Sequence, residues 1–171
     1  MKERTGMVTM KGNPIILLGE EIKVGQNAPE CTLVANDLSE VKLSSFKGKK
    51  LIIAAVPSLD TGVCDAETKK FNTEAAKLGS DVLILTISTD LPFAQKRWCA
   101  GAGVNNVKIL SDHRDVAFGT AYGVLIKGLR ILARAIFVVD TKGVVQYTEL
   151  VKEITTEPNY TAAFEAVKKN R

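Results

Sequence analysis

Runs of apolar residues separated by turn residues divide this chain into short strands and helices. An unbroken apolar run of four to eight residues is typical of a buried strand, whereas apolar residues three to four positions apart indicate a helix face. The pattern predicts strands at residues 8–10, 15–18, 31–35, 41–43, 50–56, 82–88, 107–110, 131–140 and 144–151. A turn with glycine and proline at its corner separates the first two, so they predict an N-terminal β-hairpin.

Helical periodicity follows several of these strands. A helix is expected after the strand at 50–56, because Cys64, Phe71, Ala75 and Leu78 share one narrow stripe, and Gly79 is its expected end. A second helix is expected with Pro92 in its first turn, Thr89 or Asp90 as N-cap and Gly101 as its end; a third covers 115–121, and Pro158 opens the last, with Tyr160, Ala163, Phe164 and Val167 on one face. This order predicts an α/β fold with a mixed central sheet covered on both faces.

The composition is that of a globular protein. The chain has 171 residues, of which 46% are hydrophobic and 25% charged, so we expect a single domain over residues 1–171. No apolar run approaches the ~18 residues of a membrane span. The N-terminus is polar, and the apolar run at 15–18 is too short for a signal peptide. We therefore expect a cytoplasmic protein without a membrane partner.

The charges do not indicate a nucleic-acid partner. The net charge of +4 arises from 23 basic and 19 acidic residues that are scattered along the chain. Binding to nucleic acid usually needs a basic face with interleaved aromatic residues. Aromatic residues make up only 6% of the chain, so we expect none.

Cys64 is the leading candidate for chemistry. It lies where the apolar strand at 50–56 turns into a helix, and a thiol at a helix start meets unpaired amide groups and the positive end of the helix dipole, which favour the thiolate. Pro57 fixes the chain at the strand end, Thr61 places a hydroxyl near the thiol, and Gly62 allows close approach of a ligand. Buried free cysteines are often inert, but this neighbourhood favours a nucleophile.

Arg134 interrupts an otherwise apolar strand. A guanidinium buried there needs an anionic partner, and a Cys64 thiolate would serve. The alternative is that Arg134 lies at a strand end and reaches solvent or pairs with an acid. Arg130 is the second choice, although it lies nearer the loop at Gly128. Asp65 and Glu67 would disfavour a thiolate, but we expect their helical phase to turn them to the flanks.

Two more cysteines and one histidine complete the candidate groups. Cys99 lies in the last turn of its expected helix, roughly 12–14 Å along the axis from the sheet edge. A disulfide needs Cα atoms within about 7 Å, so a bond to Cys64 would require local unwinding of a helix end. Cys31 is read as a spare strand thiol and His113 as a structural loop residue. No close cysteine pair predicts a zinc site.

The string from Pro57 to Cys64, with threonine three positions before the cysteine, resembles the active-site motif of the peroxiredoxins, in particular their thiol peroxidase subfamily. The resemblance covers nearly the whole chain. It extends to the segments Gly12–Pro14, Lys69–Asn72, Asp90–Gln95, Lys127–Leu129, Ala133–Ala135 and Glu153–Pro158.

This resemblance implies a thioredoxin-like fold with an added N-terminal hairpin, in a homodimer that thioredoxin reduces. It also implies that Cys64 is the peroxidatic cysteine, Cys99 the resolving cysteine, and Pro57, Thr61 and Arg134 the residues that activate a hydroperoxide. No metal, flavin or haem is required. Two alternatives are a binding module with a redox switch and a thiol–disulfide oxidoreductase, although the latter usually carries a Cys-x-x-Cys motif that is missing here.

Overall fold

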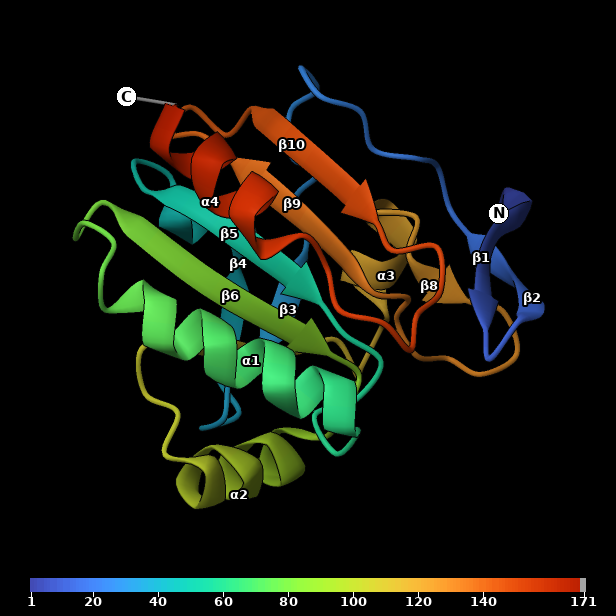
Figure 1. Ribbon diagram of the computed structural model, residues 1–171, viewed down its shortest axis with the longest axis horizontal. Helices are drawn as coiled ribbons and strands as arrows, with labels where there is room; N and C mark the ends of the chain where they lie inside the picture. The colour runs from blue at the N-terminus through green and yellow to red at the C-terminus, as the bar shows by residue number, and fades with distance from the viewer. Residues whose placement is uncertain (170–171) are drawn as a thin grey trace.

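A seven-stranded mixed sheet forms the centre of the computed structural model, which describes residues 1–169 (Figure 1). The strand order is β10-β9-β5-β6-β7-β3-β4. Strands β5, β6 and β7 are parallel, and the other pairings are antiparallel. The strands are β3 (Thr32–Val34), β4 (Glu40–Lys42), β5 (Lys50–Ala55), β6 (Val82–Ser88), β7 (Lys108–Ser111), β9 (Ala135–Val139) and β10 (Val145–Leu150).

Helices cover both faces of this sheet because its central strands are apolar on both sides. Every residue of β5 and of β9 is buried. Helices α1 (Gly62–Ala75), α2 (Pro92–Ala102) and α4 (Tyr160–Lys169) pack on one face, around a core that includes Ile52, Phe71 and Ile136. The short helix α3 (Ala117–Ala121) lies on the other face (Figure 1). The predicted face of the last helix is confirmed, since Tyr160, Ala163 and Val167 are buried and Phe164 is half-buried.

The N-terminal hairpin is confirmed and forms a second, three-stranded sheet. Strand β1 (Glu3–Met10) pairs with β2 (Asn13–Leu18), and β2 pairs with the short strand β8 (Leu125–Ile126). Lys11 and Gly12 connect β1 to β2 with positive φ angles of 50° and 78°. Positive φ at both central residues is the mark of the type I′ turn that suits a two-residue hairpin.

Several predicted boundaries were wrong. The strand expected at 131–140 begins only at Ala135, and β8 was not foreseen. Helix α1 ends at Ala75, well before Gly79, and α2 continues past Gly101 to a left-handed Gly103. The N-cap of α2 is Leu91, not Thr89 or Asp90. Asp90 instead accepts hydrogen bonds from the loop before α1, described below.

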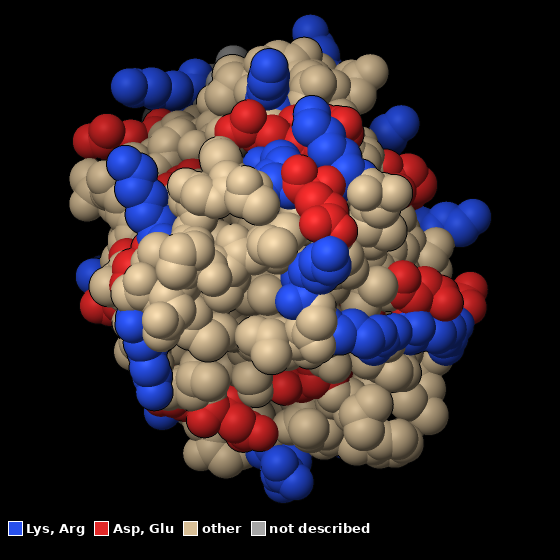
Figure 2. All heavy atoms as spheres, turned by 90° about the vertical axis from the view of Figure 1, so that its right-hand side faces the viewer, with Lys and Arg blue, Asp and Glu red and all other residues tan. Residues whose placement is uncertain are grey.

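The surface of the hairpin side carries charges of both signs. Figure 2 shows Lys and Arg lying among Asp and Glu on this face, rather than gathered into one patch. Among residues 1–169, no helix is both long and apolar enough to cross a membrane.

Candidate active site

The sheet register brings the two main candidate residues to one edge. Strand β9 runs antiparallel to β5, and Ala135 lies opposite Ala55. Arg134, just before β9, therefore lies beside the point where β5 runs into the loop at 57–61. Helix α1 begins after this loop, with Cys64 as its third residue. Residues 70 positions apart in the sequence thus meet at one end of the sheet.

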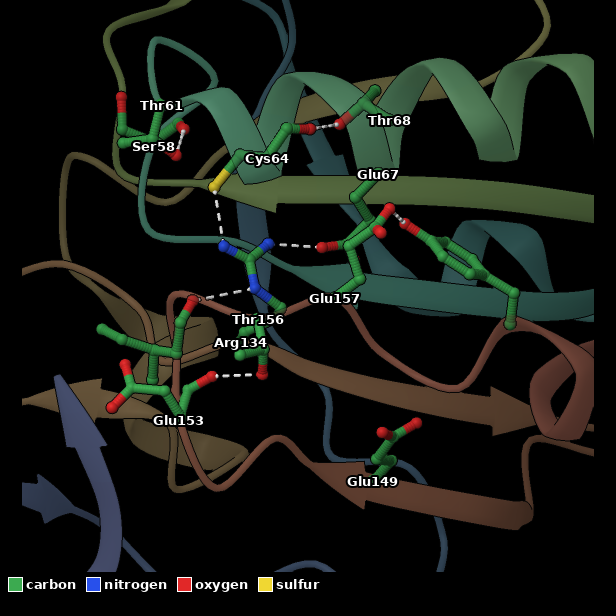
Figure 3. A network of polar contacts seen from close by, with 12 residues as sticks. Ser58, Thr61, Cys64, Glu67, Thr68, Arg134, Glu149, Glu153, Thr156 and Glu157 are labelled. Carbon is green, nitrogen blue, oxygen red and sulfur yellow. Dashed lines mark hydrogen bonds and ion pairs between the residues drawn. The ribbon is translucent and has the colours of Figure 1, made fainter. Parts of the chain in front are cut away.

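Cys64 and Arg134 are in direct contact. Nη2 of Arg134 lies 3.3 Å from Sγ of Cys64, as Figure 3 shows. Cys64 is fully buried, as expected from its phase in α1. The N-cap residue, Thr61, makes no side-chain hydrogen bond to the first turn of α1. The sulfur therefore lies near both a guanidinium and the unpaired amide end of a helix, an arrangement that stabilises a negative sulfur.

All three donor directions of Arg134 are used. Its Nη1 donates to the carboxylate of Glu67, and its Nε donates to the backbone oxygen of Ile154 at 3.0 Å. Only 1% of Arg134 is exposed. Burial alone would lower the pKa of Arg134, but Glu67 and Cys64 raise it above its ordinary value. The guanidinium is thus a fixed, permanent cation directed at the sulfur.

Glu67 corrects one sequence prediction. It does not turn to the flank of α1 but is fully buried against Arg134. Residues three apart on a helix are neighbours, so its spacing from Cys64 was the signal that could have found it. Burial raises the pKa of Glu67 to about 7, although Arg134 opposes this effect. Within residues 1–169, its Oε1 is buried without a hydrogen-bond partner.

Asp65 does turn to the flank of α1, as predicted. Its carboxylate is half-buried and accepts hydrogen bonds from Lys69 and from the indole of Trp98 on α2. The Trp98 contact is 3.1 Å long and joins the two helices that carry Cys64 and Cys99.

Pro57 and Thr61 frame the loop before Cys64. Pro57 is buried at the end of β5, and Thr61 is exposed. The Thr61 hydroxyl donates to the backbone oxygen of Ser58 at 3.0 Å. Its oxygen lone pairs are therefore free to accept a hydrogen bond, whereas donation to a ligand requires the hydroxyl to rotate.

Asp90 holds this loop in place, a role that the sequence analysis missed. Its carboxylate accepts from the Ser58 hydroxyl at 2.7 Å, from the Leu59 amide at 2.8 Å and from the Ser88 hydroxyl at 2.7 Å. Asp90 follows β6, the strand next to β5, so both loops leave the same end of parallel strands. That adjacency was the available sequence signal.

Cys99 is not brought into contact with Cys64. Both thiols are free, and Cys99 is half-buried in the last turn of α2. Its Sγ lies 4.0 Å from the amide nitrogen of Asn36 and lines a cavity of about 400 Å³ between α2 and the loop after β3. Burial raises the pKa of the Cys99 thiol, although Asn36 opposes this effect. The two sulfurs therefore have different neighbours in this conformation.

The remaining candidate groups lie elsewhere. Cys31 is buried beside β3, and burial raises the pKa of its thiol to about 12. His113 makes a local contact, between its ring nitrogen and the Ser111 hydroxyl at 3.0 Å. Arg130, the second choice for the cation, donates to the backbone oxygen of Arg114.

Comparison with known proteins identifies the family. A family model described as Redoxin matches residues 23–164. The chain belongs to the Redoxin family. Thiol peroxidases of Halalkalibacterium halodurans and Bacillus subtilis are 59% and 56% identical to it, each over 94% of this chain and 96% of the relative. The resemblance to the thiol peroxidase subfamily of the peroxiredoxins is confirmed, and the chain is a peroxidase of the peroxiredoxin type.

Solved structures support the thioredoxin-like fold. A peroxiredoxin-like protein from Aquifex aeolicus is 45% identical, with a TM-score of 0.91 over 98% of this chain and 99% of that one. A thiol peroxidase from Chromobacterium violaceum shares the fold at 22% identity, with a TM-score of 0.84 over 95% of both chains. The predicted fold class of this Redoxin family member is therefore confirmed.

Proposed function

We propose that this thiol-dependent peroxidase reduces hydrogen peroxide and organic hydroperoxides with Cys64 as the attacking nucleophile. The contact between Nη2 of Arg134 and Sγ of Cys64 at the start of α1 carries the proposal. A permanent cation there favours the thiolate and remains available to bind the oxygens of a hydroperoxide. Pro57 and Thr61 shape the adjoining loop.

In the first step, the Cys64 thiolate attacks the terminal oxygen of the hydroperoxide. An S–O bond forms, the O–O bond breaks, and the leaving oxygen takes a proton and departs as water or an alcohol. Arg134, the rotated Thr61 hydroxyl and the first-turn amides of α1 stabilise the charge that develops on the two oxygens. The sulfur is oxidised to a sulfenic acid, and the peroxide is reduced by two electrons.

In the second step, the Cys99 thiol of the same chain attacks the sulfenic sulfur, and a disulfide forms with loss of water. Because the two thiols have separate neighbours, the start of α1 or the end of α2 must unwind locally before this bond can form. A dithiol of the thioredoxin type then supplies two electrons by disulfide exchange, which restores both thiols.

A cytoplasmic, homodimeric form fits this cycle. A reducing compartment supplies the thioredoxin-type dithiol that the cycle consumes. Leu91 and Phe93, 54% and 66% exposed, flank the start of α2 close to Asp90 and offer an apolar contact for a second copy. Sedimentation of the wild type and of Phe93→Glu tests the dimer, because a charge at that contact should shift the equilibrium to monomer.

Peroxide consumption coupled to thioredoxin, thioredoxin reductase and NADPH tests the proposed cycle. We expect Cys64→Ser to abolish the reaction, and Cys99→Ser to retain the first turnover but lose recycling. Cys31→Ser is the matched control and should turn over normally, because Cys31 is buried away from both thiols. Undiminished turnover by Cys64→Ser would refute the proposal, and turnover by none of the proteins with thioredoxin would point to another reductant.

A further inference from the structure

The orientation of Arg134 depends on a backbone segment outside the α1 site. Its Nε donates to the oxygen of Ile154, and its own backbone oxygen accepts from the amide of Val151 at 3.0 Å. Because a guanidinium is planar and rigid, its three donor directions cannot be adjusted independently. A shift of the Ile154 oxygen would therefore turn Nη2 relative to the sulfur of Cys64.

The segment that carries Ile154 is held by the N-terminal hairpin. Thr9 of β1 donates its amide to the oxygen of Lys152 at 2.7 Å and accepts from the amide of Ile154 at 3.0 Å. These two bonds form an isolated parallel bridge between Thr9 and Glu153. The hairpin is thus bonded to Ile154, the same residue whose backbone oxygen accepts from Arg134.

The Glu153 side chain adds further hydrogen bonds between the hairpin and the segment that carries Ile154. One carboxylate oxygen accepts from the Thr9 hydroxyl at 2.7 Å and from the Gly12 amide at 3.0 Å. The other accepts from the Lys11 amide at 3.0 Å and from Thr155. The positive φ angles of Lys11 and Gly12 direct two successive amides toward one carboxylate, a concave arrangement suited to an anion. These hydrogen bonds lower the pKa of Glu153, so it is an anion at neutral pH.

We propose that Glu153 is a positioning residue, which fixes the turn of the N-terminal hairpin to the segment at 151–157 and thereby directs Arg134 at Cys64. Figure 3 shows Glu153 on the side of Arg134 away from Cys64. The inference rests on the proposed function and adds to it a series of contacts that links the hairpin to the sulfur of Cys64.

The test compares Glu153→Ala with Glu74→Ala. Glu74 is a matched control because it is also a carboxylate, near the end of α1, and forms a simple, partly exposed ion pair with Lys77. The first readout is the pH midpoint of Cys64 alkylation by iodoacetamide, measured in a Cys31→Ser, Cys99→Ser background without any peroxide. Glu153→Ala should move this midpoint upward and Glu74→Ala should not, because a misdirected Arg134 stabilises the thiolate less.

The second readout is a double-mutant cycle with Arg134→Lys. We expect Glu153→Ala to slow the first reaction with hydrogen peroxide about tenfold in the presence of Arg134, a typical coupling for residues in one network. In the Arg134→Lys background the same substitution should change the rate less than twofold. Equal slowing in both backgrounds would show a merely structural role and overturn the inference.

Thr9→Val provides a milder perturbation in case Glu153→Ala unfolds. It removes one donor to Glu153 and leaves the backbone bridge in place, so it should change both readouts in the same direction but less. An unchanged alkylation midpoint in both Glu153→Ala and Thr9→Val would also overturn the inference. Failure of the proposed function would appear differently. The wild type would then not reduce peroxide, although the pH dependence of its Cys64 alkylation would still respond to Glu153→Ala.

Discussion

Replacing Arg134 by methionine separates its role in folding from its proposed role in the reaction. Methionine keeps an unbranched chain of similar length but removes the charge and every donor. The substitution leaves Glu67 buried without its cation, Ile154 without its side-chain donor and Cys64 without its guanidinium contact. Each loss has a separate measurable consequence.

The loss of stability comes mainly from Glu67. Removing one partner of a buried ion pair costs about 3–5 kcal/mol, because the other charge stays buried or must take up a proton. Arg134 and Glu67 are 1% and 0% exposed as side chains, so solvent does not reduce this cost. Replacing both partners by apolar residues of similar size is often neutral or stabilising. The double variant Arg134→Met, Glu67→Met should therefore recover most of the stability.

The loss of reactivity comes from Cys64 and is not recovered. Without the guanidinium, the sulfur loses its adjacent cation, so alkylation of Cys64 by iodoacetamide at neutral pH should slow. The first reaction with hydrogen peroxide should slow by about 10²–10³-fold, the usual cost of one lost donor to a developing oxyanion. The double variant should remain equally slow, because it restores packing but no cation.

Urea unfolding at pH 8, alkylation rates between pH 4 and 10, and stopped-flow mixing with peroxide measure these three effects. Lys77→Met is the control for loss of a surface cation, and it should change none of them appreciably. A stable Arg134→Met variant would refute the buried ion-pair reasoning. A double variant that reacts at the wild-type rate would refute the role of Arg134 toward peroxide.

Three other predictions concern Glu67, Asp90 and Trp98. Burial raises the folded pKa of Glu67 from 4.5 to about 7, so its contribution to stability is present below pH 4.5 and is lost as the pH rises through 7. The unfolding free energy should therefore fall by up to about 3 kcal/mol between pH 4.5 and pH 7. The Glu67→Gln variant should not show this pH dependence. Asp90→Ala leaves the Leu59 amide without its partner and should cost about 1–3 kcal/mol; hydrogen exchange over residues 57–61 should quicken, and unchanged exchange would contradict this role. Because Trp98 donates to Asp65, unwinding that lets the disulfide form should change Trp98 emission on peroxide addition in the wild type but not in Cys99→Ser; equal changes would contradict the link.

The sequence was sufficient to predict that Cys64 and Arg134 lie in contact, because each breaks a local pattern. A cysteine at a strand-to-helix turn and a lone cation in an apolar run are visible without the fold, and the alternating strands and helices predicted the sheet that joins them. Glu67 was misjudged because helical phase alone does not show what lies opposite a helix. Its partner, Arg134, lies just before strand β9 and 67 residues away in the sequence.

Asp90 and Glu153 could not be found in this way, because their roles depend on contacts between loops. Asp90 was read as a helix cap from its position before Pro92, yet its carboxylate faces the loop before α1. Glu153 lies in an irregular segment, and its partners belong to a hairpin turn more than 140 residues earlier. Loop residues acquire such roles only when a scaffold places them side by side.

The proposed cycle places opposing demands on Cys64. Attack on peroxide needs the buried sulfur beside Arg134, whereas disulfide formation needs the same sulfur to leave this contact and meet Cys99. The chemistry itself can release it. Oxidation converts a thiolate into a neutral sulfenic acid, so the attraction that holds Cys64 to Arg134 weakens when the first step is complete. Arg134 keeps the backbone oxygen of Ile154 as a partner, and it also keeps Glu67 provided that the opening of α1 stops before residue 67, so that no buried cation is left unpaired.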